Sequence, residues 1–285
     1  MDKQLLDAYF ERIAYGGPAE PTLEVLRALH ALHPAAVPFE NLSPLSGEPV
    51  ALELPSVRRK LIDDQRGGYC FEHNTLFLAV LRALGFRASG LAARVLWNQP
   101  EEALTARGHM LLRVELDSGT FLADVGFGGM TLTAPLSLEE TLLVTASRPC
   151  EGAPQPTPHG SFRLARGAHG DLSLQADVRG EFRSLYRFDL SPAYPVDYEV
   201  SNYYLSTHPQ SHFRSGLIAA RSPQGRRFAL RNRTFTHYPL DGAPETRELS
   251  SLAELQEILA SVFQIRPSTE APWAGALKRL FPEDA

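Results

Sequence analysis

The 285-residue sequence contains very little cysteine and very little lysine. Its two cysteines, Cys70 and Cys150, cannot build the disulfide framework that stabilises small secreted domains, so a reducing compartment is expected. Lysine occurs at only three positions, which leaves arginine to carry nearly all the positive charge. The 28 basic and 33 acidic residues give a formal net charge of −5, which argues against binding nucleic acid by general electrostatic attraction.

Long apolar runs are also missing. Residues 1–7 lack the basic start and apolar core of a signal peptide, and the apolar run Leu76–Val80 is cut short by Arg82. We therefore expect a soluble, cytoplasmic protein with no membrane partner. The hydrophobic fraction of 44% is ordinary for a globular protein, and the length favours two or three packed subdomains.

Three regions with different residue patterns follow one another along the chain. Residues 1–85 carry apolar side chains at helical spacing, which predicts a helical subdomain. Residues 86–190 are short β-branched and apolar segments separated by turn signals, which predicts a β-barrel or a strongly bent sheet. Residues 191–285 mix both patterns, and Ser251 and Glu254 form a capping box that opens a helix. The expected fold class is α+β, with an N-terminal helical bundle, a central β-barrel-like subdomain and a C-terminal α/β lid.

Individual elements follow from the same patterns. Helices are predicted at residues 2–13, 22–33, 57–62, 70–84, 196–205 and 251–263, with a last short helix possible after residue 267. Strands are predicted at residues 87–97, 108–116, 120–125, 142–145, 161–165, 172–176, 180–188, 213–221, 226–232 and 234–238. Two loops are predicted in the strand-rich region, at residues 98–107 and at the proline-rich residues 149–160, whose prolines cannot donate ladder hydrogen bonds.

Cys70 lies in the segment 66–74, whose sequence is Arg-Gly-Gly-Tyr-Cys-Phe-Glu-His-Asn. Two glycines set a turn, and the helical pattern that starts at Cys70 ends before Gly85, a common C-terminal cap. Free N–H groups and the positive end of the helix dipole stabilise an anion in the first turn, so this thiol should ionise more easily than that of a free cysteine. Cys70 is therefore a candidate nucleophile.

Two candidate partners lie downstream. His109 opens a predicted strand and lies on the face opposite its apolar row, while Asp124 ends the otherwise apolar next strand and needs a specific donor or cation. A tight turn at Ser118-Gly119 would pair Asp124 with Arg113, four residues out of register with His109 but on the same face. Direct contact would then require a bulge or a wider loop. A thiol, an imidazole and a carboxylate are the parts of an activated nucleophile.

Motifs across residues 9–209 resemble those of the arylamine N-acetyltransferase family. They are Tyr9-Phe10-Glu11-Arg12-Ile13, Pro38-Phe39-Glu40-Asn41, Arg66-Gly67-Gly68-Tyr69-Cys70-Phe71-Glu72, Gly108-His109, Asp124-Val125-Gly126-Phe127-Gly128-Gly129 and Asn202-Tyr203-Tyr204-Leu205-Ser206-Thr207-His208-Pro209. The resemblance implies a cysteine-protease-like (transglutaminase-like) arrangement with a Cys70-His109-Asp124 triad. It also implies ping-pong transfer of an acetyl group from acetyl-CoA, through a Cys70 thioester, to arylamines or arylhydrazines, with no permanently bound cofactor.

Further site residues follow from the same resemblance. The acceptor pocket is expected to be lined by Phe39, Val95, Phe127 and Tyr204. The coenzyme contacts expected from the resemblance are Gly126, Ser206 and Thr207. Gly126-Phe127-Gly128-Gly129 follows a strand, but no convincing helix opens after it, so a dinucleotide-binding loop is the weaker interpretation.

Charged residues inside apolar motifs suggest a structural role. Arg66 and Glu40 are predicted to form a buried ion pair that Arg12 could share. His73 stands where the family usually has glutamine, three residues from Cys70 on nearly the same helix face. The favoured interpretation is that His73 packs and hydrogen-bonds as glutamine would, and the alternative is a proton-accepting role.

Other functions remain open at this point. The same triad would serve a cysteine hydrolase or a macrolactam-forming amide synthase, and a lid that keeps water from a thioester favours the transferase. A zinc module built from Cys70, His73, His109 and Asp124 lacks paired ligand spacing, so no metal is expected. The arginines at 226, 227, 231 and 233 are interpreted as a solvated strand face rather than a phosphate site. The protein could be a monomer or a homodimer.

Overall fold

The computed structural model describes residues 2–139, 149–167, 170–266 and 271–281. Its N-terminal part is helical, as predicted, and side-chain caps start the first two long helices: Asp2 accepts from the Leu5 N–H at 3.1 Å and Thr22 from the Val25 N–H at 3.3 Å. The helical elements here are α1 (Lys3–Arg12), α2 (Leu23–Ala36), α3 (Leu42–Ser46), α4 (Leu54–Arg58), the π-helical turn η1 (Arg59–Asp63) and α5 (Cys70–Ala83). Helix α5 begins at the predicted nucleophile.

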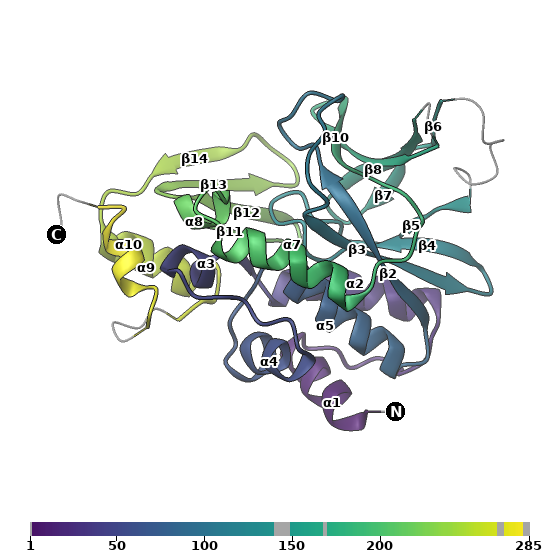
Figure 1. Ribbon diagram of the computed structural model, residues 1–285, viewed down its shortest axis with the longest axis horizontal. Helices are drawn as coiled ribbons and strands as arrows, with labels where there is room; N and C mark the ends of the chain where they lie inside the picture. The colour runs from purple at the N-terminus through teal and green to yellow at the C-terminus, as the bar shows by residue number, and fades with distance from the viewer. Residues whose placement is uncertain (1, 140–148, 168–169, 267–270, 282–285) are drawn as a thin grey trace.

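A nine-stranded, largely antiparallel sheet follows α5, curls through the right-hand half of Figure 1 and carries α5 against strands β2 and β3. Its strands are β2 (Arg87–Val95), β3 (His109–Leu116), β4 (Gly119–Ala123), β5 (Leu136–Ser137), β6 (Cys150–Glu151), β7 (Gln155–Thr157), β8 (Gly160–Arg166), β9 (Leu172–Val178) and β10 (Glu181–Phe188). The strand order is β5-β4-β3-β2-β10-β9-β8-β6, and β7 also pairs with β8. The bent sheet expected for residues 86–190 is confirmed.

Two predictions in this region need comment. The proline-rich segment 149–160 was predicted to be a solvated loop, but Cys150–Glu151 and Gln155–Thr157 both pair with β8. That prediction was wrong because these short strands lie at the edge of the sheet, where a proline leaves no inner ladder donor unpaired. The strand predicted at residues 142–145 lies outside the described residues.

A second sheet has five strands in the order β1-β11-β12-β13-β14; β1 comes from the N-terminal region, and the other four strands come from the C-terminal region, whose described residues also form four helices. Its strands are β1 (Phe39–Glu40), β11 (Ile218–Arg221), β12 (Arg226–Arg231), β13 (Thr234–Pro239) and β14 (Glu245–Glu248). The helices are α7 (Pro195–Thr207), α8 (His212–Ser215), α9 (Leu252–Ser261) and α10 (Ala274–Lys278). The strand predicted at 213–221 was half wrong, because its first residues form α8, where Ser211 caps the turn by accepting from the Phe213 N–H.

The two sheets are joined through the N-terminal part of the chain. Strand β1 leaves the helical region and pairs antiparallel with β11, where Phe39 lies opposite Ala220. Phe39 also forms an isolated parallel bridge with Gly68, which lies just before α5. The segment just before α5 is therefore connected to the C-terminal sheet through β1.

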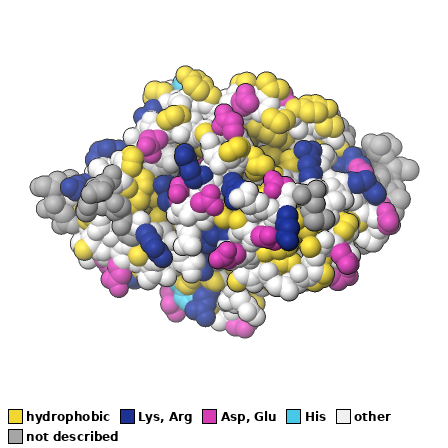
Figure 2. Space-filling view, turned by 90° about the horizontal axis from the view of Figure 1, so that it is seen from below, with side chains coloured by type: hydrophobic (Ala, Val, Ile, Leu, Met, Phe, Trp, Pro, Cys, Tyr) yellow, Lys and Arg dark blue, Asp and Glu magenta, His cyan; other side chains and the backbone are white. Residues whose placement is uncertain are grey.

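Three hydrophobic clusters fill the interior. One packs the N-terminal helices against β2, β3 and β4, one fills the curled sheet, and one lies between the C-terminal sheet and the helices α9 and α10. The α+β fold class is confirmed. No helix in the described part of the chain is long and apolar enough to span a membrane. On the face shown in Figure 2, basic and acidic side chains are interspersed, with apolar side chains between them.

Candidate active site

The structure brings Cys70, His109 and Asp124 together from three elements. Cys70 is the first residue of α5, His109 is the first residue of β3, and Asp124 directly follows β4. The Nε2 atom of His109 lies 2.7 Å from Oδ2 of Asp124, and the Cys70 thiol, which interacts electrostatically with the same imidazole, lies 3.7 Å from the carbonyl oxygen of Gly108, the residue that precedes His109. All three are buried, with exposed fractions of 4% for Cys70, 2% for His109 and 0% for Asp124. A thiol, an imidazole and a carboxylate are thus gathered in the interior of the protein.

The β3–β4 hairpin reaches this contact without a bulge. Leu116 pairs with Gly119, so the turn is Asp117-Ser118 rather than Ser118-Gly119, and the register is shifted by two residues from the one predicted. Arg113 therefore pairs with Leu122, not with Asp124. Continuing this register places Asp124 beside Leu111, one diagonal position from His109 on the same face, which is within reach of two long side chains. The expected need for a bulge or a wider loop was wrong.

Asp124 receives three hydrogen bonds that hold it as a carboxylate. Besides His109, its donors are the side-chain amide of Asn74 at 2.9 Å and the backbone N–H of Gly126 at 2.9 Å, both to Oδ1. Burial would raise the pKa of Asp124, but the charge and hydrogen bond of His109 and these two donors lower it. The backbone N–H of Asp124 in turn donates to Nε2 of His30 at 3.1 Å, which fixes the main chain at this position.

Electrostatics in the site favour a protonated imidazole. Burial alone would lower the pKa of His109, but the Asp124 charge and the hydrogen bonds to Asp124 and Cys70 raise it to about 10. The His109 ring is held by Phe127, edge to face at 5.3 Å between centroids, and by Tyr186 at 4.9 Å. Such an imidazolium can stabilise a thiolate at Cys70 and later deliver or accept a proton.

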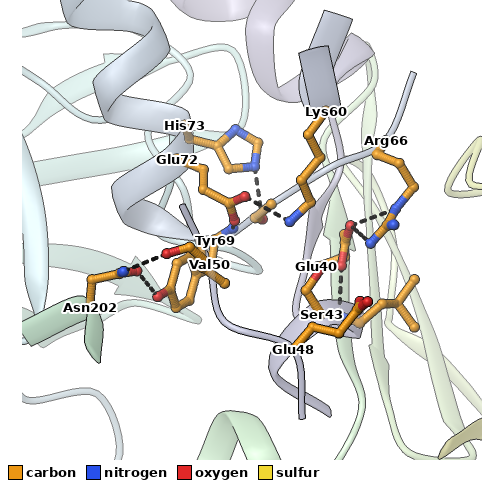
Figure 3. Close-up of polar contacts among 12 residues, drawn as sticks. Glu40, Ser43, Glu48, Val50, Lys60, Arg66, Tyr69, Glu72, His73 and Asn202 are labelled. Carbon is orange, nitrogen blue, oxygen red and sulfur yellow. Dashed lines mark hydrogen bonds and ion pairs between the residues drawn. The ribbon is translucent and has the colours of Figure 1, made fainter. Parts of the chain in front are cut away.

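Two ion pairs surround the loop that precedes Cys70. Arg66 donates to Oε1 of Glu40 through Nε at 3.0 Å and through a terminal nitrogen at 2.6 Å, and Lys60 lies 2.7 Å from Glu72 (Figure 3). Glu72 also accepts the Tyr69 N–H at 3.0 Å, so it caps the start of α5. The predicted Arg66–Glu40 pair is confirmed, and one of the three lysines takes part in the second pair.

The pKa values of the two buried carboxylates, Glu40 and Glu72, are shifted in opposite directions. Burial would raise the pKa of Glu40, but the Arg66 charge, together with the Leu42 N–H at 2.6 Å, lowers it. Burial raises the pKa of Glu72, and the neighbouring Glu40 charge adds to this, although Lys60 opposes it. Arg66 thus secures Glu40 as an anion.

Arg12 does not share that pair. Its Nε donates to the carbonyl of Leu61 at 3.0 Å, and Arg66 is the residue whose side chain bonds Glu40 in the described part of the chain. The expectation for Arg12 was therefore wrong, because its side chain is hydrogen-bonded to the η1 turn instead.

His73 is not hydrogen-bonded to Cys70, His109 or Asp124. Its Nδ1 lies 2.8 Å from Nε2 of His33, and its Nε2 lies 3.0 Å from the carbonyl of Gly68. Both ring nitrogens are thus engaged in the interior, as the packing interpretation predicted. The zinc set that included His73 is not assembled, and no group of metal-ligating side chains was found among the described residues.

The predicted pocket residues occupy different environments. Phe39 is buried and stacks parallel to the His73 ring with 6.2 Å between centroids, while Phe127 lies against His109. Val95 ends β2 and is partly buried. Tyr204 lies on α7, is 44% exposed and stacks on His208 at 4.4 Å.

The predicted coenzyme residues are likewise separated. The Gly126 N–H is used by Asp124, and a Cβ atom at this glycine would lie 2.9 Å from Cα of Cys70, so only glycine fits. Ser206 is 1% exposed, and its hydroxyl donates to the Asn202 carbonyl at 2.8 Å. The hydroxyl of Thr207 donates to the Tyr203 carbonyl. Each hydroxyl therefore already has a backbone acceptor within α7.

The arginines of β12 do not form one basic face. Arg226 and Arg231 are exposed, but Arg227 is buried and donates to the carbonyl of Thr131 at 2.8 Å and to the hydroxyl of Ser222 at 3.0 Å. Burial lowers the pKa of Arg227 to about 10. This guanidinium joins the segment after Gly126 to the C-terminal sheet.

Several residues at the site were not identified from the sequence. Asn74 had a usable signal, because it lies one helical turn after Cys70 and so on the same face of α5. Asn202, whose Oδ1 accepts from the Tyr69 hydroxyl, lay within a quoted motif without an assigned role. His30 and Lys60 gave no signal, since each reaches the site from a distant helix or turn.

The chain is similar to known proteins in both sequence and structure. The family model described as N-acetyltransferase matches residues 22–271. An arylamine N-acetyltransferase of Escherichia coli is 41% identical over 260 residues, which cover 91% of this chain and 88% of that protein. One of Mycolicibacterium smegmatis is 41% identical over 265 residues, 91% of each chain. The solved arylamine N-acetyltransferase of Mycobacterium marinum superposes with a TM-score of 0.88 at 39% identity, covering 96% of this chain and 99% of that one. A second structure of that protein, in complex with CoA, also gives a TM-score of 0.88.

Proposed function

The chain belongs to the arylamine N-acetyltransferase family, and on that premise we propose that Cys70 carries an acetyl group from acetyl-CoA to the nitrogen of an arylamine or arylhydrazine. The protein is an acyltransferase, with acetyl-CoA as a co-substrate rather than a bound cofactor. The observation that carries the proposal is the buried Asp124–His109 hydrogen bond of 2.7 Å, together with the Cys70 thiol held beside His109, at 3.7 Å from the Gly108 carbonyl. Cys70, His109 and Asp124 are the proposed triad.

In the first half-reaction the Cys70 thiolate attacks the acetyl carbonyl of acetyl-CoA. The carbon–sulfur bond to coenzyme A breaks, the leaving thiolate takes the proton from the His109 imidazolium, and coenzyme A departs with acetyl-Cys70 left behind. Asp124 keeps the imidazole oriented through Nε2, which leaves the other ring nitrogen for the proton exchange with the sulfur. Backbone N–H groups in the first turn of α5 are the proposed donors to the oxyanion.

In the second half-reaction the acceptor nitrogen attacks the thioester carbonyl. Neutral His109 takes the proton from the attacking nitrogen, the carbon–sulfur bond breaks, and the thiolate–imidazolium pair is restored. Two half-reactions through one covalent intermediate give ping-pong kinetics. Phe39, Val95, Phe127 and Tyr204 are the proposed acceptor contacts, and Gly126, Ser206 and Thr207 the proposed coenzyme contacts.

The three regions of the chain have separate proposed tasks. Residues 1–85 supply the nucleophile, residues 86–190 supply His109 and Asp124, and residues 191–285 act as a lid. Support for the lid comes from α7, where Asn202 bonds the Tyr69 hydroxyl and where Cδ1 of Leu205 would lie 3.5 Å from a Cβ atom placed on Gly108. Because the lid lies over the segments next to Cys70, it limits the access of water to the thioester and favours transfer over hydrolysis.

The proposal is tested by measuring intact mass after adding acetyl-CoA without an acceptor. An acetyl adduct should form, map to the Cys70 peptide and disappear when an arylamine is added. Cys70→Ala should form no adduct, whereas the matched variant Cys150→Ala, which changes the second free cysteine, should form it normally. Native protein that forms no adduct would exclude this function. An adduct that water discharges as fast as an arylamine does would favour the hydrolase.

A further inference from the structure

Three buried side chains that the proposed mechanism does not use form a continuous chain behind α5. They are Tyr9 of α1, His33 of α2 and His73 of α5, and each is at most 1% exposed. The Tyr9 hydroxyl lies 2.9 Å from Nδ1 of His33, and Nε2 of His33 lies 2.8 Å from Nδ1 of His73. Nε2 of His73 then lies 3.0 Å from the Gly68 carbonyl and 3.2 Å from the Pro38 carbonyl.

The end of this chain fixes the position of every proton in it. Carbonyl oxygens only accept, so Nε2 of His73 carries a hydrogen, and Nδ1 of the neutral ring must accept. Nε2 of His33 is therefore a donor, its Nδ1 is an acceptor, and the Tyr9 hydroxyl donates to it. With both rings neutral, all hydrogen bonds point from α1 towards the two carbonyls.

The Gly68 carbonyl belongs to the segment that precedes α5, and the Pro38 carbonyl lies directly before β1. The Gly68 carbonyl also accepts from the Glu40 N–H at 2.7 Å, and the Gly68 N–H donates to the Pro38 carbonyl at 3.3 Å. Gly68 lies two residues before Cys70, and His73 lies three residues after it, so the His73 bond closes a ring around the helix start (Figure 3). A shift of Gly68 would therefore move the backbone from which the Cys70 side chain extends.

The charged and titratable groups around the chain favour neutral rings. Arg12 on α1 and His30 on α2 face His33, and Lys60 on η1 faces His73. Glu40 on β1 also faces His73, but Arg66 already neutralises it. Burial lowers the pKa of His73 to about 4 against the opposing effect of the two carbonyls, and burial together with His73, His30 and Arg12 lowers the pKa of His33 well below its usual range.

We propose that His33 and His73 are positioning residues of the acetyl transfer: as neutral rings, with Tyr9, they hold the Gly68 carbonyl and so keep Cys70 where His109 can reach its thiol. Neither ring touches substrate or the reacting atoms. This inference rests on the proposed function and deepens it, because it assigns the two histidines to the step in which Cys70 is acetylated. Protonation of His73 at Nδ1 would put a donor opposite the Nε2–H donor of His33, so it would disturb the bond between the two rings that holds His73 against Gly68.

The variants His73→Gln and His73→Leu separate hydrogen bonding from packing. Glutamine offers an amide donor for the two carbonyls and an amide oxygen for the His33 N–H, whereas leucine fills the space without either. The measurements are the single-turnover rate at which acetyl-CoA acetylates the thiol from pH 8 to pH 5, the KM of the arylamine, and the rate at which iodoacetamide alkylates the thiol. His237→Gln, on β13, is the surface control.

We expect His73→Leu to lower the acetylation and alkylation rates at pH 7.5 by about tenfold with little change in the KM of the arylamine. We expect His73→Gln to stay within about threefold of the native rate, and to keep its rate to a lower pH because it takes up no proton. If His73→Leu does not fold, Tyr9→Phe tests the same chain, because it removes the terminal donor, and should lower both rates about threefold.

Two results would overturn the inference: a native rate in His73→Leu, or rates in His73→Gln as low as those of the leucine variant. A lowered melting temperature with native rates per folded molecule would also overturn it, because the chain would then be structural only. Failure of native protein to form acetyl-Cys70 would refute the proposed function instead. Iodoacetamide alkylation needs no acetyl-CoA, so it would still show whether His73 positions the thiol.

Discussion

Glu40→Gln tests the buried ion pair between Glu40 and Arg66, which lies in the segment just before α5. The Glu40 side chain is completely buried, and its Oε1 receives both hydrogen bonds from Arg66, whose side chain keeps 20% of its exposure. Glutamine has nearly the same volume and can still accept the Leu42 N–H, so the substitution removes the charge and little else. It leaves the guanidinium of Arg66 partly buried without its bonded carboxylate.

Breaking a buried ion pair by removing one partner costs about 3 to 5 kcal/mol. The lower end, about 3 kcal/mol, is expected here because Arg66 keeps some contact with water and because the Glu72 charge also stabilises it. At about 2 °C per kcal/mol for a chain of this size, the melting temperature should fall by about 6 °C. Differential scanning calorimetry at pH 7.5 and low salt measures this directly.

Two further variants make the result specific. Glu151→Gln breaks the Arg163–Glu151 pair, in which Glu151 is 66% exposed, and should change the stability by less than about 1 kcal/mol. Adding Arg66→Met to Glu40→Gln should recover part of the loss, because the unpaired guanidinium is then gone. If Glu40→Gln melts within about 1 °C of the native protein, the attribution of stability to this pair is wrong.

Three other predictions follow from the same region. The free energy of unfolding should fall as the pH is lowered from about 6.5 to about 4. Burial lowers the pKa values of His30 and His73 to about 4, so in this pH range the two rings bind protons only in the unfolded state. Each ring contributes up to about 3 kcal/mol, and the melting temperature measured against pH checks this. Gly67→Ala should prevent folding or lower the melting temperature by more than about 6 °C, because its Cβ atom would lie 2.0 Å from the Pro38 carbonyl oxygen; soluble yield and calorimetry check this. Asn74→Leu should slow acetylation of the thiol about tenfold and move the pH profile of that rate, since it removes a hydrogen bond to the carboxylate that orients His109; a native profile would contradict this role.

The local parts of the fold could be predicted from the sequence because each carries its own signal. Capping residues and apolar spacing located α1, α2 and α9 to within a few residues, and the glycines before Cys70 located the start of α5. The pairing of β1 with β11 had no such signal. It joins Phe39 to Ala220, so far along the chain that no pattern in either segment identifies the other.

The limits at the site have the same origin. The residues of the proposed triad were identified from their chemistry and motifs, but the distance between His109 and Asp124 depended on which two residues form the turn between their strands. Gly119, with a φ of +133°, could occupy either the turn or the first strand position, and a shift of two residues decides whether the side chains meet. Tertiary neighbours such as His30 and Lys60 lie on other elements, so a local pattern could not reveal them.

The arrangement of these supports explains why a single loop can hold a reactive thiol in place. The segment before α5 is bound on one side by the Arg66–Glu40 pair and on the other by the His73 ring, and Asn202 reaches it from α7 through the Tyr69 hydroxyl. Each contact comes from a different element, so no single motion of one helix can release the loop. The His109 imidazole that must approach the thiol comes from the curled sheet. Small displacements of the helical region, the curled sheet and the C-terminal region would therefore all change the distance between His109 and Cys70. Because the segment before α5 is bound to all three regions, such displacements are reduced. Preorganisation of this kind is what acyl transfer in a water-poor site requires.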